Sequence, residues 1–79
     1  MTKTLESARH KALIRMLITK RDALDMTQAR LAALIGEQQS LVARLESGQR
    51  RVDVVEFLDL AVALRFDPVE VLVWLREMG

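Results

Sequence analysis

The stretch TQARLAALIGEQQSLVARLESG, residues 27–48 of a 79-residue chain, decides the fold. It divides into two short segments with apolar residues at helical spacing, separated by Gly36 and ended by Gly48. Thr27 is a favoured N-cap residue, Ala32 is small enough for two helices to approach, and Gly36 permits a sharp turn. The stretch therefore predicts two helices in a helix-turn-helix layout.

The second of these segments, residues 39–47, has an apolar side and a polar side. Val42 and Leu45 point back to the core, so the opposite side presents polar residues, namely Gln38, Gln39, Ser40 and Arg44. Gln can pair with adenine through two hydrogen bonds, Arg with guanine, and Ser with either kind of partner in the major groove. An alternative interpretation is that these side chains only solvate an exposed helix, but the turns on both sides favour DNA reading.

Apolar residues recur at helical spacing along the rest of the chain, which predicts an all-α fold of five helices. The first is expected over residues 5–24. The fourth and fifth open at Asp53 and Asp67, each followed three residues later by Glu, a pattern that resembles a capping box. Pro68 at the first helical position strengthens the fifth start. We expect one domain over residues 1–79, with residues 1–12 extending the first helix at its N-terminal side.

These residues resemble the helix-turn-helix of the Cro/lambda-repressor type transcriptional regulators, the XRE family. The resemblance is carried by Leu17, Arg21, Thr27, Gln28, Leu31, Ala32, Gly36, Gln39, Ser40, Val42, Arg44, Glu46, Gly48, Ala61 and Leu64. It implies a compact lambda-repressor-like DNA-binding domain of four or five helices, with residues 39–47 in the major groove of operator DNA.

The resemblance also implies roles for individual residues. Gln38, Gln39, Ser40 and Arg44 fall on base-reading positions, and phosphate contacts fall on Thr27, Gln28, Arg50 and Arg51. Gln28 is further expected to brace the recognition helix, and Arg21 and Glu46 are expected to form a structural ion pair. Three residues depart from the family pattern: Glu37 replaces a small apolar residue, and Asp25 and Arg65 replace glycines.

The formal net charge of +1 hides an uneven distribution along the chain. Residues 1–52 hold ten Lys and Arg against five Asp and Glu, a net charge of +5, whereas residues 53–79 hold two against six, a net charge of −4. A basic half that contains the helix-turn-helix suits DNA, and an acidic half suits a partner or solvent. The alternative explanation is chance asymmetry in a small protein.

The segment 67–78 is apolar over more of its circumference than one core-facing side needs. With Pro68, Val71, Leu72 and Leu75 facing the core, four apolar residues remain on other faces, namely Val69, Val73, Trp74 and Met78. Exposed apolar patches usually mark interfaces. We therefore expect a dimerisation helix that sets two recognition helices about 34 Å apart on a near-palindromic operator. The alternative is that Trp74 closes the small core.

The N-terminal extension carries Lys3, Arg9, His10 and Lys11, for which three roles stay open: contact with the DNA backbone, part of the interface, or a solvated first turn. The chain has no cysteine and one histidine, so no metal site, cofactor or nucleophilic catalysis is expected, and an enzyme is the least favoured class. Its longest apolar run, residues 71–75, is far below the roughly 20 residues of a membrane span. A cytoplasmic protein is expected.

The sequence thus predicts a bacterial or phage transcriptional regulator, a repressor that binds operator DNA as a homodimer without a cofactor. The nearest alternative is an antitoxin that represses its own operon and has a toxin as protein partner. A third reading is an adaptor that keeps the fold without binding DNA.

Overall fold

A computed structural model describes residues 7–78, which form five α-helices and no strand. The helices are α1 (Ala8–Ala23), α2 (Gln28–Leu34), α3 (Gln39–Glu46), α4 (Val54–Leu64) and α5 (Pro68–Glu77). The expected all-α fold with a helix-turn-helix at α2 and α3 is confirmed. Within the described residues, no helix has the length and apolar character needed to cross a membrane.

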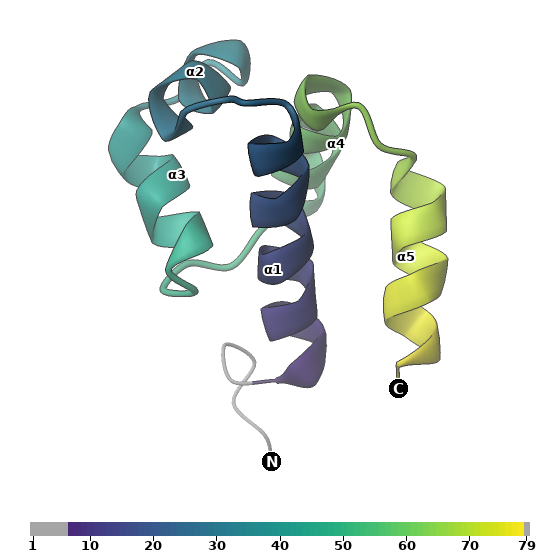
Figure 1. The fold of residues 1–79 in the computed structure, drawn as a ribbon. Coiled ribbons are helices and arrows are strands. Elements are labelled where there is room, and N and C mark those ends of the chain that lie inside the picture. The colour runs from purple at the N-terminus through teal and green to yellow at the C-terminus, as the bar shows by residue number, and fades with distance from the viewer. Residues whose placement is uncertain (1–6, 79) are drawn as a thin grey trace.

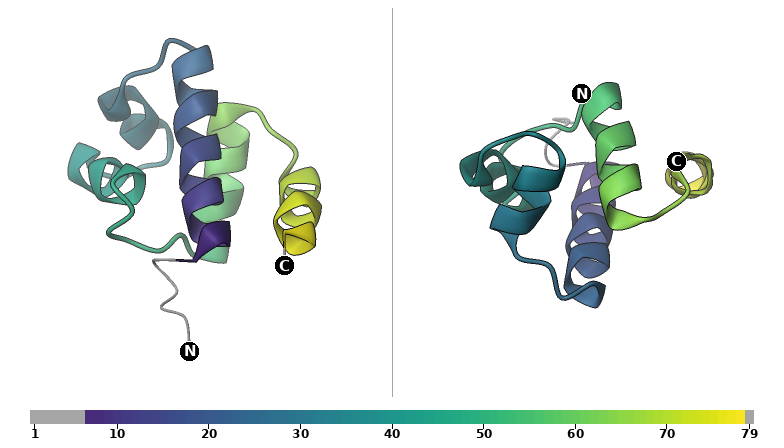
Figure 2. Two further views of the ribbon diagram at one scale, coloured as in Figure 1. Left: turned by 60° about the horizontal axis from the view of Figure 1, so that its bottom comes forward. Right: turned by 90° about the horizontal axis from the view of Figure 1, so that it is seen from above.

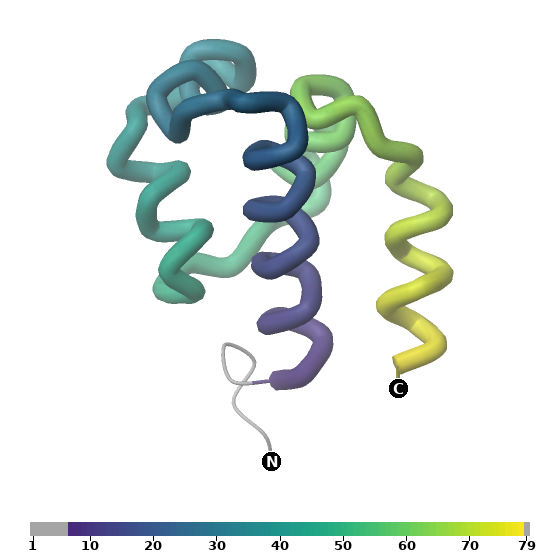
Figure 3. The backbone as a smooth tube through the Cα atoms, viewed as in Figure 1, coloured from purple at the N-terminus to yellow at the C-terminus, as the bar shows by residue number. Residues whose placement is uncertain are grey.

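The helices α1 and α4 lie side by side at the centre, with α2 and α3 on one side and α5 on the other (Figure 1, Figure 2). The core lies where α1, α2, α3 and α4 meet, and its most deeply buried side chains are Leu60, Leu64 and Val42. Leu17 of α1 and Leu31 of α2 pack into the same cluster. The α2–α3 pair therefore rests on one continuous apolar core. Figure 3 traces the path of the backbone through these helices.

Four helices end in the same way, with one residue in the left-handed conformation. Gly36 and Gly48 have φ of +71° and +81°, while Asp25 and Arg65 adopt +53° and +61° despite their side chains. At α2 the N–H of Glu37 donates to the carbonyl of Ala32, in a Schellman arrangement that recurs at the ends of α1, α3 and α4. Asp25 and Arg65, which replace the family's glycines, thus keep the glycine-type turn at some cost in strain.

Side-chain caps stabilise the starts of four helices. Two of these starts differ from the expectations based on the sequence. The first helix begins at Ala8, capped by Ser7, rather than at residue 5, which lies outside the described residues. A full capping box forms at Asp53 and Glu56 but not at Asp67, whose carboxylate accepts from Val69 instead. The ψ of Asp67 is 113° against 170° at Asp53, so its carboxylate is directed toward an earlier N–H.

Two leucines are exposed although helical spacing places them on core-facing sides: Leu34, which the spacing groups with Leu31, Ala32 and Ile35, and Leu72 of α5. Leu34 is 45% exposed because α2 has only seven residues and its buried side ends with Leu31 and Ala32. Leu72 is 54% exposed because the buried side of α5 is centred on Val71. Leu72 instead lines a groove with Leu58 of α4. The helix α5 therefore buries less apolar surface than its sequence predicts.

Candidate nucleic-acid interface

The helix α3 separates its side chains into a buried face and a solvent face. Leu41, Val42 and Leu45 are buried against the core. The four residues expected to read bases are all exposed, namely Gln38, Gln39, Ser40 and Arg44. Gln38 sits at the N-cap with extended backbone, and its side chain makes no capping bond, so it stays available. The structure brings the four polar side chains onto one surface at the first two turns of α3.

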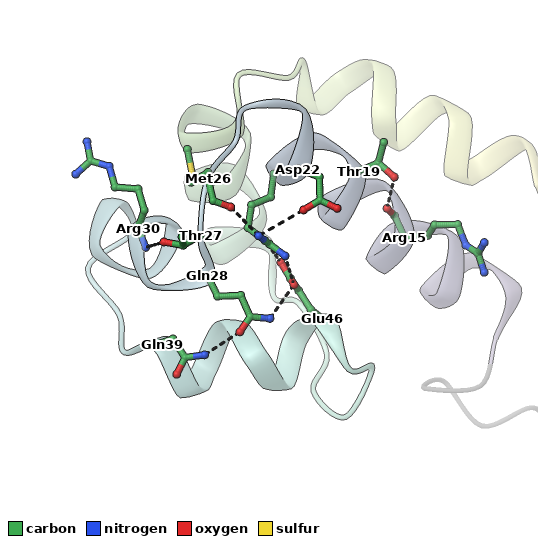
Figure 4. Close-up of polar contacts among 10 residues, drawn as sticks. Arg15, Thr19, Asp22, Met26, Thr27, Gln28, Arg30, Gln39 and Glu46 are labelled. Atoms are coloured by element: carbon green, nitrogen blue, oxygen red, sulfur yellow. Dashed lines mark hydrogen bonds and ion pairs between the residues drawn. The ribbon is translucent and has the colours of Figure 1, made fainter.

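Thr27 and Gln28, at the start of α2, are already engaged within the protein. The Thr27 hydroxyl accepts from the N–H of Arg30 at 3.0 Å and caps α2. The Gln28 amide donates from Nε2 to Oε1 of Glu46 at 2.9 Å and accepts from Nε2 of Gln39 at 2.8 Å (Figure 4). Gln28 thus lies between the start and the end of α3, which is the bracing position that the resemblance implies. One N–H of its amide is left for an outside acceptor.

Arg21 and Glu46 form the ion pair expected between α1 and the end of α3. The guanidinium Nε lies 2.6 Å from Oε2 and donates to it, and Nη2 donates to Oε1 at 2.9 Å, a two-pronged geometry. A third donor, Nη1, reaches the carbonyl of Met26 at 2.6 Å. The side chains are only 13% and 9% exposed. Hydrogen bonding to Glu46 raises the pKa of Arg21, so the guanidinium stays charged throughout the pH range of a folded protein.

The two arginines after α3 differ in their surroundings. Arg50 donates to Oε1 of Glu56 at 2.7 Å, and this hydrogen bond raises the pKa of Arg50. Arg51 is exposed and makes no side-chain ion pair among the described residues. Both charges lie beside the C-terminal end of α3, but Glu56 offsets the field of Arg50. The sequence did not single out Glu56 for this role, although its place in the first turn of α4, six residues after Arg50, is a visible signal.

The first turn of α1 carries three of the four residues considered for the N-terminal extension, namely Arg9, His10 and Lys11. Arg9 donates from Nε to the carbonyl of Leu75 at 2.9 Å and from Nη2 to that of Arg76 at 3.1 Å, so it ties α1 to the end of α5. His10 is buried, 8% exposed, with Nε2 unpaired among the described groups. Lys11 is exposed, and Lys3 lies outside the described residues. Arg9 therefore ties α1 to the end of α5 at the surface, and His10 is part of the packed interior.

The four residues expected at a dimer interface are exposed, three of them on α5 and Met78 at its C-cap. Val69 is 64% exposed, and Val73, Trp74 and Met78 are exposed by 37% to 43%. Trp74 lies over α1, beside Met16 and Lys20, so one face of the indole is partly covered. The apolar surface extends beyond the expected residues to Leu72 and, on α4, to Leu58 and Val54, which line one groove with it. The apolar residues at the exposed positions of α4 could have predicted this extension of the surface.

The polar side chains on the outer face of α3 differ in kind from those of a metal site. Residues 7–78 contain no cluster of three or more His, Cys, Asp or Glu placed to hold an ion. The polar groups that converge are instead amides, hydroxyls and guanidinium groups on the outside of α3. Such groups bind base edges and phosphates through hydrogen bonds and charge.

Comparison with known proteins agrees with this geometry. A family model described as helix-turn-helix matches residues 17–71. An uncharacterized HTH-type transcriptional regulator of Haemophilus influenzae is 39% identical over 59 residues, which cover 75% of this chain and 60% of that protein. The chain thus spans less than two thirds of that relative's length.

Two solved structures are similar over most of their own length. An XRE-family like protein from Pseudomonas syringae pv. tomato is 40% identical, with a TM-score of 0.82 over 91% of this chain and 88% of that one. The restriction-modification controller protein C.AhdI from Aeromonas hydrophila is 38% identical, with a TM-score of 0.73 over 81% of this chain and 93% of that one.

Proposed function

Because this chain belongs to the XRE-type helix-turn-helix family of DNA-binding transcriptional regulators, we propose that it is a repressor that binds a near-palindromic operator as a homodimer. The observation that carries the proposal is the outer face of α3. This face presents Gln38, Gln39, Ser40 and Arg44 together while its opposite face is anchored in the core. Side chains near the N-terminus of a recognition helix reach base edges most directly.

In the proposed complex, α3 lies in the major groove and other groups hold the phosphates. The free N–H of Gln28 and the unpaired guanidinium of Arg51 are suited to phosphate oxygens, whereas Arg50 contributes less because Glu56 offsets its charge. Thr27, the N-cap of α2, is exposed next to Gln28. Glu37, exposed just before α3, disfavours phosphates close to the turn. Specificity therefore depends chiefly on the face of α3.

The proposed homodimer forms through the apolar surface of α5 and α4. Val71 is the one buried residue of α5, whereas Val69, Leu72, Val73, Trp74 and Met78 are exposed. A monomer rarely leaves so much of a helix apolar in water, and a second copy covers it in an isologous pairing. The two-fold axis then relates two recognition helices, which matches a near-palindromic site.

The test is selection of bound sequences from a random DNA pool by the purified protein. We expect a consensus of two related half-sites whose centres lie about 10 base pairs, one turn of DNA, apart. A single half-site, or selection without consensus, would contradict the proposed dimeric operator complex. A partner protein such as a toxin is the second occupant to consider for the α5 surface. Its co-purification with an otherwise monomeric chain would favour the antitoxin role over the homodimer.

A further inference from the structure

The helix α1 is tied near each of its ends to a different flanking helix by an arginine. Near its C-terminal end, Arg21 donates to both carboxylate oxygens of Glu46 at the end of α3. In its first turn, Arg9 donates from Nε to the carbonyl of Leu75 at 2.9 Å and from Nη2 to that of Arg76 at 3.1 Å. The two arginines are separated by about 18 Å along the helix, at a rise of about 1.5 Å per residue. The helix α1 therefore connects the proposed recognition helix to the proposed dimerisation helix.

The turn of α1 that carries Arg9 is itself fixed by its neighbours. The Ser7 hydroxyl caps this turn by accepting from the N–H of His10 at 3.1 Å. The side chain of His10 is buried, so the turn is anchored in the packed interior. Figure 1 shows the first turn of α1 and the last turn of α5 at the same end of the molecule. Arg9 thus reaches the end of α5 from a backbone position that is already determined.

The helix α5 is held by different contacts along its length. Its start follows directly from α4, where Phe66 packs against Phe57 with ring centroids 5.6 Å apart and Asp67 caps the first turn. Its middle is anchored by Val71, which is buried. At its last turn, the hydrogen bonds from other helices come from Arg9 alone within residues 7–78. A guanidinium charge there also suits the negative end of the helix dipole. The direction of α5 relative to α1 therefore depends on Arg9.

We propose that Arg9 is a positioning residue that sets the spacing of the two half-sites bound by the dimer. In the proposed dimer, α5 pairs with its copy, and each recognition helix lies about 17 Å from the two-fold axis, half of one turn of DNA. A tilt of α5 by about 10° would move the recognition helix by about 3 Å, close to the rise of one base pair. The inference rests on the proposed function, because it requires a dimer formed through α5.

The experiment measures affinity as a function of half-site spacing. Two copies of one selected half-site are placed on a series of DNA duplexes in which the distance between their centres changes one base pair at a time. The parent should bind one spacing best and lose affinity on either side of it. In Arg9→Ala the end of α5 loses both hydrogen bonds, so we expect the preference for the best spacing over its neighbours to fall on the order of 10-fold.

Two further measurements on Arg9→Ala distinguish positioning from a general loss of function. The dissociation constant of the dimer, measured by sedimentation, should rise on the order of 10-fold, because both copies must hold α5 in place. The base preference within each half-site should stay that of the parent, since the hydrogen bonds of Arg9 lead to α5 and leave the contacts of α3 intact.

The matched control is Lys11→Ala, which removes one positive charge from the same turn of α1. Lys11 is exposed and lines a groove between α1 and the end of α3, away from α5. Its loss should lower affinity equally at every spacing and leave the spacing profile and the dimer unchanged. A second variant, Arg9→Lys, keeps the charge but loses the planar fork that reaches two consecutive carbonyls. We expect its spacing profile to lie between those of the parent and Arg9→Ala.

The outcomes separate this inference from the proposed function. If the parent selects no operator with two half-sites, the proposed function fails and the inference fails with it. If the parent has a sharp spacing profile and folded Arg9→Ala keeps that profile, the inference is overturned while the proposed function stands. Weaker dimerisation with an unchanged profile would also overturn it, because Arg9 would then stabilise α5 without positioning it.

A broadened spacing profile in Arg9→Ala but not in Lys11→Ala, with the base preference unchanged, supports the inference. A merely structural role would lower affinity without changing the preferred spacing. Should circular dichroism show that Arg9→Ala is unfolded at the assay temperature, Arg9→Lys decides the question. A profile of Arg9→Lys equal to that of the parent would then overturn the inference, and a broadened one would support it.

Discussion

The helices α3 and α5 lie on opposite flanks of the α1–α4 pair (Figure 1). Their outer faces differ, because that of α3 is polar and that of α5 is largely apolar. Of eight residues, α3 buries three and exposes polar side chains. Of ten residues, α5 buries Val71 alone and exposes apolar ones. The apolar side chains of α3 are thus already buried within one chain, and its exposed face is suited to a polar partner in water. In contrast, α5 leaves apolar side chains in contact with solvent, and their burial against a further apolar surface would be favourable.

The two helices are also held by different forces. Gln28 joins the start of α3 at Gln39 to its end at Glu46, whose ion pair with Arg21 is formed by side chains that are only 9% and 13% exposed. The end of α5 is held by two hydrogen bonds from the exposed side chain of Arg9. Variants that disturb α3 should therefore change folding or base preference, and variants that disturb α5 should change assembly.

The largest effect is expected for Glu46→Ala, which leaves the partly buried Arg21 without its partner. We expect the free energy of unfolding to fall by about 3 kcal/mol, measured by urea denaturation. The control is the double variant Arg21→Met with Glu46→Leu, which removes both charges and should recover much of the loss. Equal stability of Glu46→Ala and the parent would show that α3 does not depend on the pair.

The next effect concerns assembly through α5. Leu72→Asp places a charge in the apolar surface, and we expect the dimer to dissociate more than 10-fold more readily in sedimentation experiments, because a desolvated carboxylate has no partner there. The matched control is Val62→Asp. Val62 is 81% exposed on α4 and lies beside Arg30 and Leu34, away from α5. An unchanged dimer in Leu72→Asp would remove this face of α5 from the interface.

For the base-reading face of α3, Arg44→Ala should weaken operator binding by about 1–3 kcal/mol and relax the preference at one position. Binding to random DNA should change much less, because Arg44 is proposed to contact a base edge. The measurement is a pair of titrations, on the operator and on unrelated DNA, at one salt concentration. Equal losses on both would make Arg44 a phosphate contact instead.

A smaller effect compares the turns that lead into the two helices. Gly36 precedes α3 with a φ of +71°, whereas Arg65 precedes α5 with a φ of +61°. Since a side chain costs roughly 1 kcal/mol in this conformation, Arg65→Gly should raise the free energy of unfolding by about 0.5–1 kcal/mol. Gly36→Ala should lower it by a similar amount, because its added methyl group meets open space and only the backbone is strained. Thermal unfolding checks both.

The smallest effect is expected for phosphate contacts near the end of α3. Arg51→Ala should weaken operator and random DNA alike and reduce the slope of log affinity against log salt by about 0.9. Arg50→Ala should change the slope less, because Glu56 already accepts from this guanidinium at 2.7 Å. Equal slopes for the two variants would show that the ion pair with Glu56 opens when DNA binds.

Local sequence features were sufficient to predict where most helices begin and end and which face of α3 is polar. A cap such as Thr27 or Asp53 acts on an N–H three residues away, and Gly36 and Gly48 act on their own φ, so these features can be read without knowing the fold. The spacing of Val42 and Leu45 likewise determined which side of α3 remains outside. The resemblance supplied the partners Arg21 and Glu46.

The sequence did not predict which long side chains contact one another or how each helix is rotated against its neighbours, because both depend on the packing of segments far apart in the chain. The contacts of Glu46 with Arg21 and Gln28 join atoms from α1, α2 and α3. Arg9 likewise reaches carbonyls 66 and 67 residues later in the chain. The exposure of Leu72 depends on the angle at which α5 meets α4. Periodicity gives the faces of a helix relative to one another, whereas packing against other segments gives the face that is buried.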